Sequence, residues 1–281
     1  MSDARLDRLS INQITVKSWN LEQTVNGCAA AGIHRVGLWL DRVAETGVPR
    51  TRQLLADNDM QVSSVCRAGF FTGETATARR KAQQENFESI ELTAAIGADV
   101  LYLVCGGVPP ESRDLAGARA AVLDGIAELA PRAHAAGVRL AVEPLHPLFC
   151  GERSVVVTLR QALDIAAEFP AEDVGVAVDS FNVWWDPGIL ETIGAAGERV
   201  ISYQVCDWLV PLPHPVYGRG VPGDGVIDFP PITAAVSAAG YDGPIEVEIF
   251  NEQVWATDPV QVLELVKQRF VRVFESGAAG S

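Results

Sequence analysis

The stretch Leu140-Ala141-Val142-Glu143-Pro144-Leu145-His146-Pro147 decides how the rest of the chain is interpreted. Three apolar residues that suit a buried strand lead directly into a carboxylate, and two prolines then prevent the strand from continuing. A glutamate at the end of a buried strand is costly to bury alone, so we expect Glu143 to face a cavity, a cation or both. A strand end that merely meets solvent is the competing interpretation of any one such motif.

Similar strand ends recur in the second half of the chain. The β-type run 176–179 ends in Asp179, the run 202–207 contains Gln204, and the run 245–250 contains Glu248. If these strands are parallel, their carboxyl ends meet at one edge, and Glu143, Asp179, Gln204 and Glu248 converge there. Oxygen ligands favour Mg²⁺ or Mn²⁺ over zinc, so we predict one divalent metal between these four residues. Polar strand ends capped by loop amides are the alternative.

Short β-type runs alternate with helical runs along the whole chain. We predict strands at 9–15, 34–40, 61–66, 100–105, 139–143, 174–179, 200–205 and 244–249, and helices at 20–31, up to 58, and at 76–96, 111–136, 158–168, 188–196, 232–239 and 259–274. Loops are predicted at 67–73 and 207–229. Eight strand–helix units indicate a single (β/α)8 TIM barrel. The barrel would form one catalytic domain over residues 1–275, followed by a flexible tail at 276–281. An open doubly wound sheet is the alternative, but it would need an early glycine-rich phosphate loop that opens a helix, and Gly106-Gly107 is instead followed by Pro109-Pro110.

Composition narrows the class of protein. The 281 residues carry a net charge of -14, which argues against a nucleic-acid partner. The charged N-terminus leads into no apolar signal core, and no apolar run is long enough to span a bilayer, so we expect a cytoplasmic protein without membrane contact. The five cysteines form no CxxC pair, which suits reduced thiols.

Several segments resemble those of a known family. They are Glu143–Pro147, Asp179–Pro187, Gln204–Trp208, Gly220–Phe229 and Glu246–Phe250. In these segments the chain resembles sugar phosphate isomerases and epimerases of the xylose isomerase-like TIM-barrel superfamily. The resemblance implies a divalent metal held by Glu143, Asp179, the residue at position 204 and Glu248, and an arginine, Arg219, that contacts the substrate. Many relatives have histidine where this chain has Gln204 and Asn182, which puts the fourth metal ligand in question.

The stretch 62–71, together with 37–39, resembles a narrower branch. That branch includes the catalytic subunits of C-glycoside deglycosidases, which act on 3-oxo-glycosides by β-elimination and pair with a small second subunit. Candidate residues for binding a sugar or glycoside substrate are Trp39, Arg67, Asn182, Trp208 and Arg219, although core packing competes as the role of the aromatic residues. A homo-oligomer or a small second subunit is possible.

The chemistry that the family shares is removal of a proton next to a carbonyl. Returning that proton isomerises or epimerises the substrate, whereas expelling a β-substituent cleaves it. We assign catalysis to His146, Glu143 and Glu248. His146 is proposed as the proton-transfer residue, because imidazole titrates near working pH. The alternative is a metal-bound acid/base pair of Glu143 and Glu248. An endonuclease IV-like nuclease would need more than the four histidines present, and a non-catalytic sugar-binding barrel would bind no tight metal.

Overall fold

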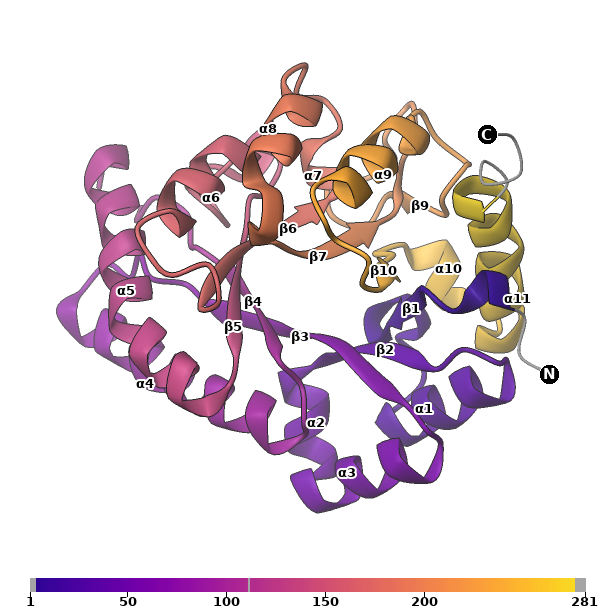
Figure 1. Cartoon of the computed structure of the whole chain (residues 1–281). Coiled ribbons are helices and arrows are strands. Elements are labelled where there is room, and N and C mark those ends of the chain that lie inside the picture. The colour runs from indigo at the N-terminus through magenta and orange to yellow at the C-terminus, as the bar shows by residue number, and fades with distance from the viewer. Residues whose placement is uncertain (1–3, 111, 276–281) are drawn as a thin grey trace.

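Eight parallel strands close into a barrel in the computed structural model, which describes residues 4–110 and 112–275 (Figure 1). Around the barrel the strands follow the order β1-β10-β7-β6-β5-β4-β3-β2, so the last barrel strand pairs with the first. The predicted TIM barrel is therefore confirmed. The barrel strands are β1 (Leu9–Asn12), β2 (Arg35–Trp39), β3 (Gln61–Gly69), β4 (Val100–Val104), β5 (Arg139–Glu143), β6 (Val174–Asp179), β7 (Val200–Val205) and β10 (Ile245–Val247).

Helices form a ring outside the strands, as Figure 1 shows. Their ends follow local signals: Asn20 forms a capping box with Gln23 at the start of the first helix. Gly137 ends the fifth major helix in the left-handed conformation, with φ of 69°. The helices are α1 (Leu21–Ala30), α2 (Leu40–Thr46), α3 (Val48–Asp57), α4 (Ala76–Ala95), α5 (Leu115–Ala136), α6 (Leu159–Ala166), α7 (Ser180–Val183), α8 (Ile189–Ala196), α9 (Phe229–Ala238), α10 (Glu252–Ala256) and α11 (Pro259–Phe270).

Several predicted boundaries are wrong. Strand β3 continues to Gly69, three residues into the predicted loop 67–73. Helix α5 begins at Leu115 rather than at 111, because the Asp114 side chain accepts a hydrogen bond from Gly117 N and caps the helix. The helix predicted to end near residue 58 is two helices, which separate at Gly47 with its φ of 83°.

The segment 207–229, predicted as a loop, contains a small two-stranded sheet. Strands β8 (Asp207–Trp208) and β9 (Arg219–Gly220) pair antiparallel outside the barrel. Helix α9 then begins at Phe229 instead of at 232, with proline in its first turn. The first strand ends at Asn12, earlier than predicted, and a 3₁₀ turn follows it.

The core has two parts that differ in size and polarity. The larger part fills the space between the strands and the ring of helices. The smaller part lies inside the barrel and includes Tyr102, Ala141 and Ala177. Ala177 precedes Asp179 by two residues, so the inward face of β6 passes from a small apolar side chain to a carboxylate at the strand's carboxyl end. The polar end of the barrel interior is where the predicted ligands lie.

Two predictions extend beyond what the structure tests. The flexible tail at 276–281 lies outside the described residues, and the single catalytic domain over 1–275 stays a prediction. Within 4–110 and 112–275, the structure contains no helix of the length and hydrophobicity that crossing a membrane requires.

Candidate active site

Three carboxylates at the carboxyl ends of the strands contact a shared pair of polar side chains. Asn182 Nδ2 donates to Asp179 Oδ2 at 2.7 Å and to Glu143 Oε1 at 3.2 Å. Arg219 Nη1 lies 2.9 Å from Glu248 Oε2 and 3.5 Å from Asp179 Oδ2. All five side chains are buried. The structure thus brings Glu143, Asp179 and Glu248 together at the end of the barrel where TIM-barrel enzymes hold their active sites.

Arg219 is held rigidly between aromatic rings. Its guanidinium carbon lies 4.6 Å from the ring centre of Phe181 and 4.7 Å from that of Phe250. Its backbone is fixed as well, because Arg219 N donates to Phe250 O and its carbonyl accepts from Asn251 Nδ2. In the part of the chain that the structure describes, Arg219 Nε has no hydrogen-bond partner. A buried donor left free beside a pocket is suited to a ligand oxygen.

Asp207 organises the segment that carries Arg219. Its carboxylate is fully buried and accepts four backbone hydrogen bonds, from Trp208 N, Gly223 N, Gly225 N and Ile227 N, at 2.8 to 3.1 Å. Gly225 must be glycine, because a Cβ there would meet the Trp208 carbonyl and the Asp207 carboxylate. The turn is therefore folded around one carboxylate rather than around an apolar core.

Gln204 lies one layer lower, in a separate polar network. Its Nε2 donates to Glu246 Oε1 at 2.7 Å, and Asn12 Nδ2 donates to the same oxygen at 2.7 Å. The hydroxyls of Ser63 and Ser64 donate to Glu246 Oε2. Glu246 thus links side chains from β1, β3, β7 and β10 across the barrel interior. The amide nitrogen of Gln204 is committed to this network.

Burial and mutual repulsion shift the titration of the clustered carboxylates. Burial, and then the charges of Asp179 and Glu248, raise the pKa of Glu143 well above its ordinary value. Burial also raises the pKa of Asp179, against the influence of Arg219. Burial raises the pKa of Glu248 to about 7, with Arg219 opposing and Asp179 adding to the shift. A carboxylate with a pKa near 7 can accept and return a proton at neutral pH.

A pocket opens above these groups. It is lined by Glu143, Asn182, Arg219 and Glu248, and by two further arginines, Arg67 and Arg153. Its free volume is about 30 Å³, which is room for a water molecule or two rather than for a sugar. Side chains at the rim must therefore move to admit a substrate.

His146 does not line this pocket. Its ring packs against Trp208, with ring centres 4.7 Å apart, and against Trp185 at 5.8 Å. Its Nδ1 accepts a hydrogen bond from Leu148 N at 3.2 Å, and burial lowers its pKa. The backbone N–H of His146 donates to Asn182 Oδ1, so the residue reaches the carboxylates through Asn182 rather than directly.

The predicted site residues thus divide into three groups. Those that line the pocket or contact its carboxylates are Glu143, Asp179, Glu248, Asn182, Arg219, Arg67 and Trp39. Gln204 lies beneath the pocket, and His146 and Trp208 lie beside it in an aromatic cluster. Sequence reasoning missed Arg153, Asp207 and the role of Glu246. The sequence held no local signal for the role of Asp207, because the turn that donates to its carboxylate begins 16 positions later.

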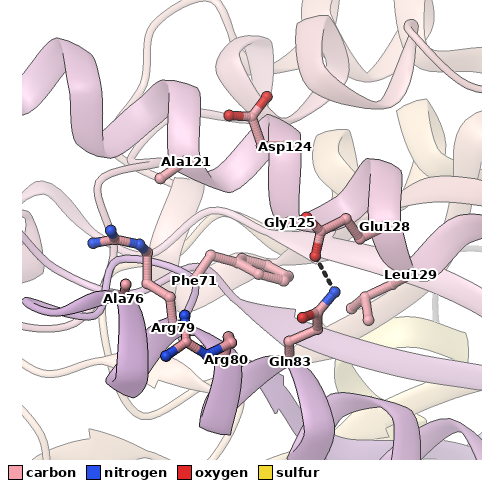
Figure 2. A pocket seen from close by; sticks show the side chains of 10 residues that line it. All are labelled: Phe71, Ala76, Arg79, Arg80, Gln83, Ala121, Asp124, Gly125, Glu128 and Leu129. Carbon is pink, nitrogen blue, oxygen red and sulfur yellow. Dashed lines mark hydrogen bonds between the residues drawn. The ribbon is translucent and has the colours of Figure 1, made fainter.

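A larger cavity lies on the outer wall of the barrel, between α4 and α5. Figure 2 shows Arg79 and Arg80 on α4, Glu128 on α5 and Phe71 between them, with the Asp124 carboxylate of α5 directed away from the two arginines. The cavity measures about 320 Å³. Its four charged side chains are solvent-exposed and balance one another, so they need no ligand to offset a buried charge. We therefore place the candidate active site at the strand ends.

Among the four predicted metal ligands, Glu143, Asp179 and Glu248 are better suited than Gln204 to bind a divalent cation. Within 4–110 and 112–275, no three His, Cys, Asp or Glu side chains are already gathered in a metal-holding arrangement. Asn182 and Arg219 bridge Glu143, Asp179 and Glu248 instead. Three buried carboxylates around one guanidinium leave negative charge in excess, which a hard cation would offset. The three carboxylates therefore have the chemistry to hold a metal, whereas Gln204 is a weak candidate for the fourth ligand.

The family is settled by comparison with known proteins. A family model described as the xylose isomerase-like TIM barrel matches residues 26–269. The chain belongs to this family. The resemblance inferred from the sequence segments is therefore confirmed at the level of the family, while the narrower C-glycoside deglycosidase branch stays a prediction.

Known relatives of the chain include enzymes. A 3-dehydroshikimate dehydratase of Pseudomonas aeruginosa is 30% identical over 249 residues, which cover 84% of this chain and 37% of the relative. A ketose 3-epimerase of Arthrobacter globiformis is 27% identical over 173 residues, which cover 60% of this chain and 54% of the relative. A crystal structure of a Sinorhizobium meliloti protein superimposes with a TM-score of 0.93 at 38% identity and covers 95% of this chain and 98% of that one. The chain spans well under two thirds of both enzymes.

Proposed function

We propose that this protein is a divalent-metal-dependent enzyme that removes a proton from a carbon next to a carbonyl group of a sugar or sugar-derived substrate. One observation carries the proposal: three buried carboxylates meet at the strand ends of a TIM barrel, and two of them, Glu143 and Glu248, line a pocket. Relatives named as a dehydratase and as a ketose epimerase support it. Both names describe reactions that begin with removal of a proton beside a carbonyl group.

Glu143, Asp179 and Glu248 would hold the metal, with Gln204 a weaker fourth ligand. The bound cation supplies Lewis acidity, which stabilises negative charge on the substrate's carbonyl oxygen. Mn²⁺ and Mg²⁺ suit the oxygen donors best. Asn182 keeps Glu143 and Asp179 oriented by donating to both carboxylates.

Glu248 is the residue that we propose as the base. Glu248 lines the pocket and its Oε2 lies 2.9 Å from Arg219 Nη1, so a positioned carboxylate is available there to accept a carbon-bound proton. Glu143, which accepts a hydrogen bond from Asn182, would deliver a proton to the opposite face of the substrate. Arg219 contacts Glu248 and leaves its Nε free for a substrate oxygen. Returning the proton gives isomerisation or epimerisation, whereas loss of a β-substituent gives a lyase, of which a C-glycoside deglycosidase is one form.

His146 remains a second candidate for proton transfer. Its hydrogen bond from Leu148 N occupies the Nδ1 lone pair, so only rotation of the ring would free that atom. We therefore rank His146 below Glu143 and Glu248 as a candidate for the residue that transfers the proton. A nuclease of the endonuclease IV type is a weaker fit, because the chain has a net charge of -14 and only four histidines.

Deuterium exchange tests the proposal without knowledge of the final product. The purified protein would be analysed for bound Mg, Mn and Zn, loaded with each metal, and incubated in D₂O with a ketohexose or with 3-dehydroshikimate. NMR would follow loss of the proton beside the carbonyl group. We expect exchange with at least one compound, and expect Glu248→Gln to abolish it while metal stays bound. If the purified protein binds none of the three metals and catalyses no exchange of the proton beside the carbonyl group in either compound, the proposal is refuted.

A further inference from the structure

We propose that the pocket contains an anion-binding subsite formed by Arg67 and Arg153, so that the substrate carries a carboxylate or a phosphate group in addition to its carbonyl. This inference rests on the proposed function, because it adds a substrate class to the same pocket. Both arginines line the pocket together with Glu143 and Glu248. The lining of the pocket therefore combines carboxylates with guanidinium groups.

Arg67 is brought into the pocket by an irregularity at the end of β3. Val65 pairs with Leu101 and Ala68 pairs with Leu103, so three steps along β3 correspond to two along β4. Successive side chains of a regular strand point to opposite faces, yet Cys66 and Arg67 both line the pocket. Bulges of this kind commonly re-aim a side chain next to an active site.

The guanidinium of Arg67 lies against aromatic rings instead of against a carboxylate. Its central carbon is 5.5 Å from the ring centre of Trp39 and 5.2 Å from that of Phe70. Across residues 4–110 and 112–275, no Asp or Glu oxygen comes within ion-pair distance of it. Stacking of this kind fixes the plane of the group while leaving its N–H donors along the edge for an acceptor.

Arg153 reaches the same space from the loop after β5. The loop is tied to the end of β4, because Gly106 N donates to Arg153 O at 3.0 Å and Arg153 N donates to Phe149 O at 2.9 Å. The guanidinium lies over the Phe149 ring at 5.4 Å, and it too has no carboxylate partner among the described residues. Burial lowers the pKa of Arg153, and the charges of Arg67 and Arg219 lower it further.

Arg219 differs from this pair in one respect that matters. Its charge is already offset by Glu248 and Asp179. Arg67 and Arg153 bring two further positive charges near each other, and no carboxylate oxygen of the described residues lies within ion-pair distance of either, although the charges of Glu143 and Glu248 raise the pKa of Arg153. Like charges held together repel, and an anion between them would convert repulsion into charge-assisted hydrogen bonds. The pocket that both groups line is too small for a sugar, so side chains around it must shift when a substrate binds.

Three matched compounds would test the subsite on the metal-loaded protein: a ketohexose, its 6-phosphate and the corresponding keto-sugar acid. Calorimetry would give the affinity and NMR in D₂O the proton exchange. We expect one of the two anionic compounds to bind at least ~10-fold more tightly than the neutral sugar, as charged hydrogen bonds allow. The anionic compound that binds more tightly shows whether the subsite prefers a phosphate or a carboxylate group. The preference should weaken as salt is added.

Variants separate the subsite from the proposed chemistry. Arg67→Met and Arg153→Met keep much of the apolar stem and should each weaken binding of the preferred anion ~10–100-fold, and should weaken binding of the neutral sugar by a clearly smaller factor. Arg80→Met, on the exposed outer wall, is the control for loss of a positive charge. Equal affinity for all three compounds, or variants that bind the anion as wild type does, would overturn the subsite. Tight anion binding without proton exchange in any compound would leave the subsite standing and refute the proposed function.

Discussion

Substitutions of Glu246 test whether this residue stabilises the barrel interior rather than taking part in catalysis. Its Oε1 accepts from the amides of Asn12 and Gln204, and its Oε2 accepts from the hydroxyls of Ser63 and Ser64. In Glu246→Ala the two hydroxyls can turn toward other acceptors, but the two buried amides lose theirs. Each such loss costs about 1–3 kcal/mol, so the free energy of unfolding should fall by about 2–6 kcal/mol. That is a large share of the ~5–15 kcal/mol that stabilises a typical domain.

Glu246→Gln should be much milder. Its amide oxygen can replace Oε1 for both amide donors, and its amide nitrogen can donate to the serine hydroxyls, which are able to accept. Only the charge assistance is lost, so we expect a cost of about 1–3 kcal/mol. Urea denaturation with an unchanged slope would measure both values, and Glu45→Gln on the exposed surface is the control. A Glu246→Ala protein as stable as wild type would refute the network. If Glu246→Gln is as stable as wild type but no longer catalyses proton exchange, the idea that Glu246 only supports the barrel interior is refuted.

Three further predictions concern the metal, the proton and the surface. Asp179→Ala should purify with less bound metal than wild type, because a hard cation depends on anionic oxygen; undiminished metal measured by mass spectrometry would exclude Asp179 as a ligand. His146→Ala should keep its metal and lose ~10²–10⁴-fold in kcat if His146 is the base, whereas a near-normal kcat would assign the proton to Glu143 and Glu248. His134 Nδ1 lies 2.6 Å from Asp173 Oδ1, and that hydrogen bond raises the pKa of His134. Its contribution to stability is therefore complete below the unfolded pKa of ~6.5 and is lost as pH rises through the folded pKa. Thermal unfolding should accordingly show His134→Gln less stable than wild type at pH 5.5 and equal to it at pH 9, and a difference independent of pH would contradict this.

The barrel could be predicted because its signals are local. Each predicted strand is a short β-type run between helical segments, and several helices end at a glycine such as Gly137. Glu143 and Asp179 could be placed at one end of the barrel because each ends its own strand. Parity also placed Asp179 correctly on the inward face, above Ala177.

The features of the site that could not be predicted depend on how neighbouring strands and loops are aligned with one another. Gln204 faces inward as predicted, yet its partner is Glu246, because β10 places Glu246 opposite Gln204 in the register. Strand periodicity within one segment cannot reveal that pairing. Arg153 lies in a loop whose path is set by Gly106, 47 positions earlier in the chain. The irregularity that turns Arg67 inward likewise arises between β3 and β4, not within β3 alone.

The four backbone hydrogen bonds to Asp207 have a consequence for how molecules enter and leave the pocket. Opening the turn at 223–227 would expose a buried carboxylate and break the three bonds that the turn donates to it, so this side of the rim resists motion. The opposite side carries Arg67 and Arg153, which are held by aromatic faces instead of by ion pairs. We therefore expect the turn around Asp207 to stay closed, while the side chains of Arg67 and Arg153 shift to admit a substrate.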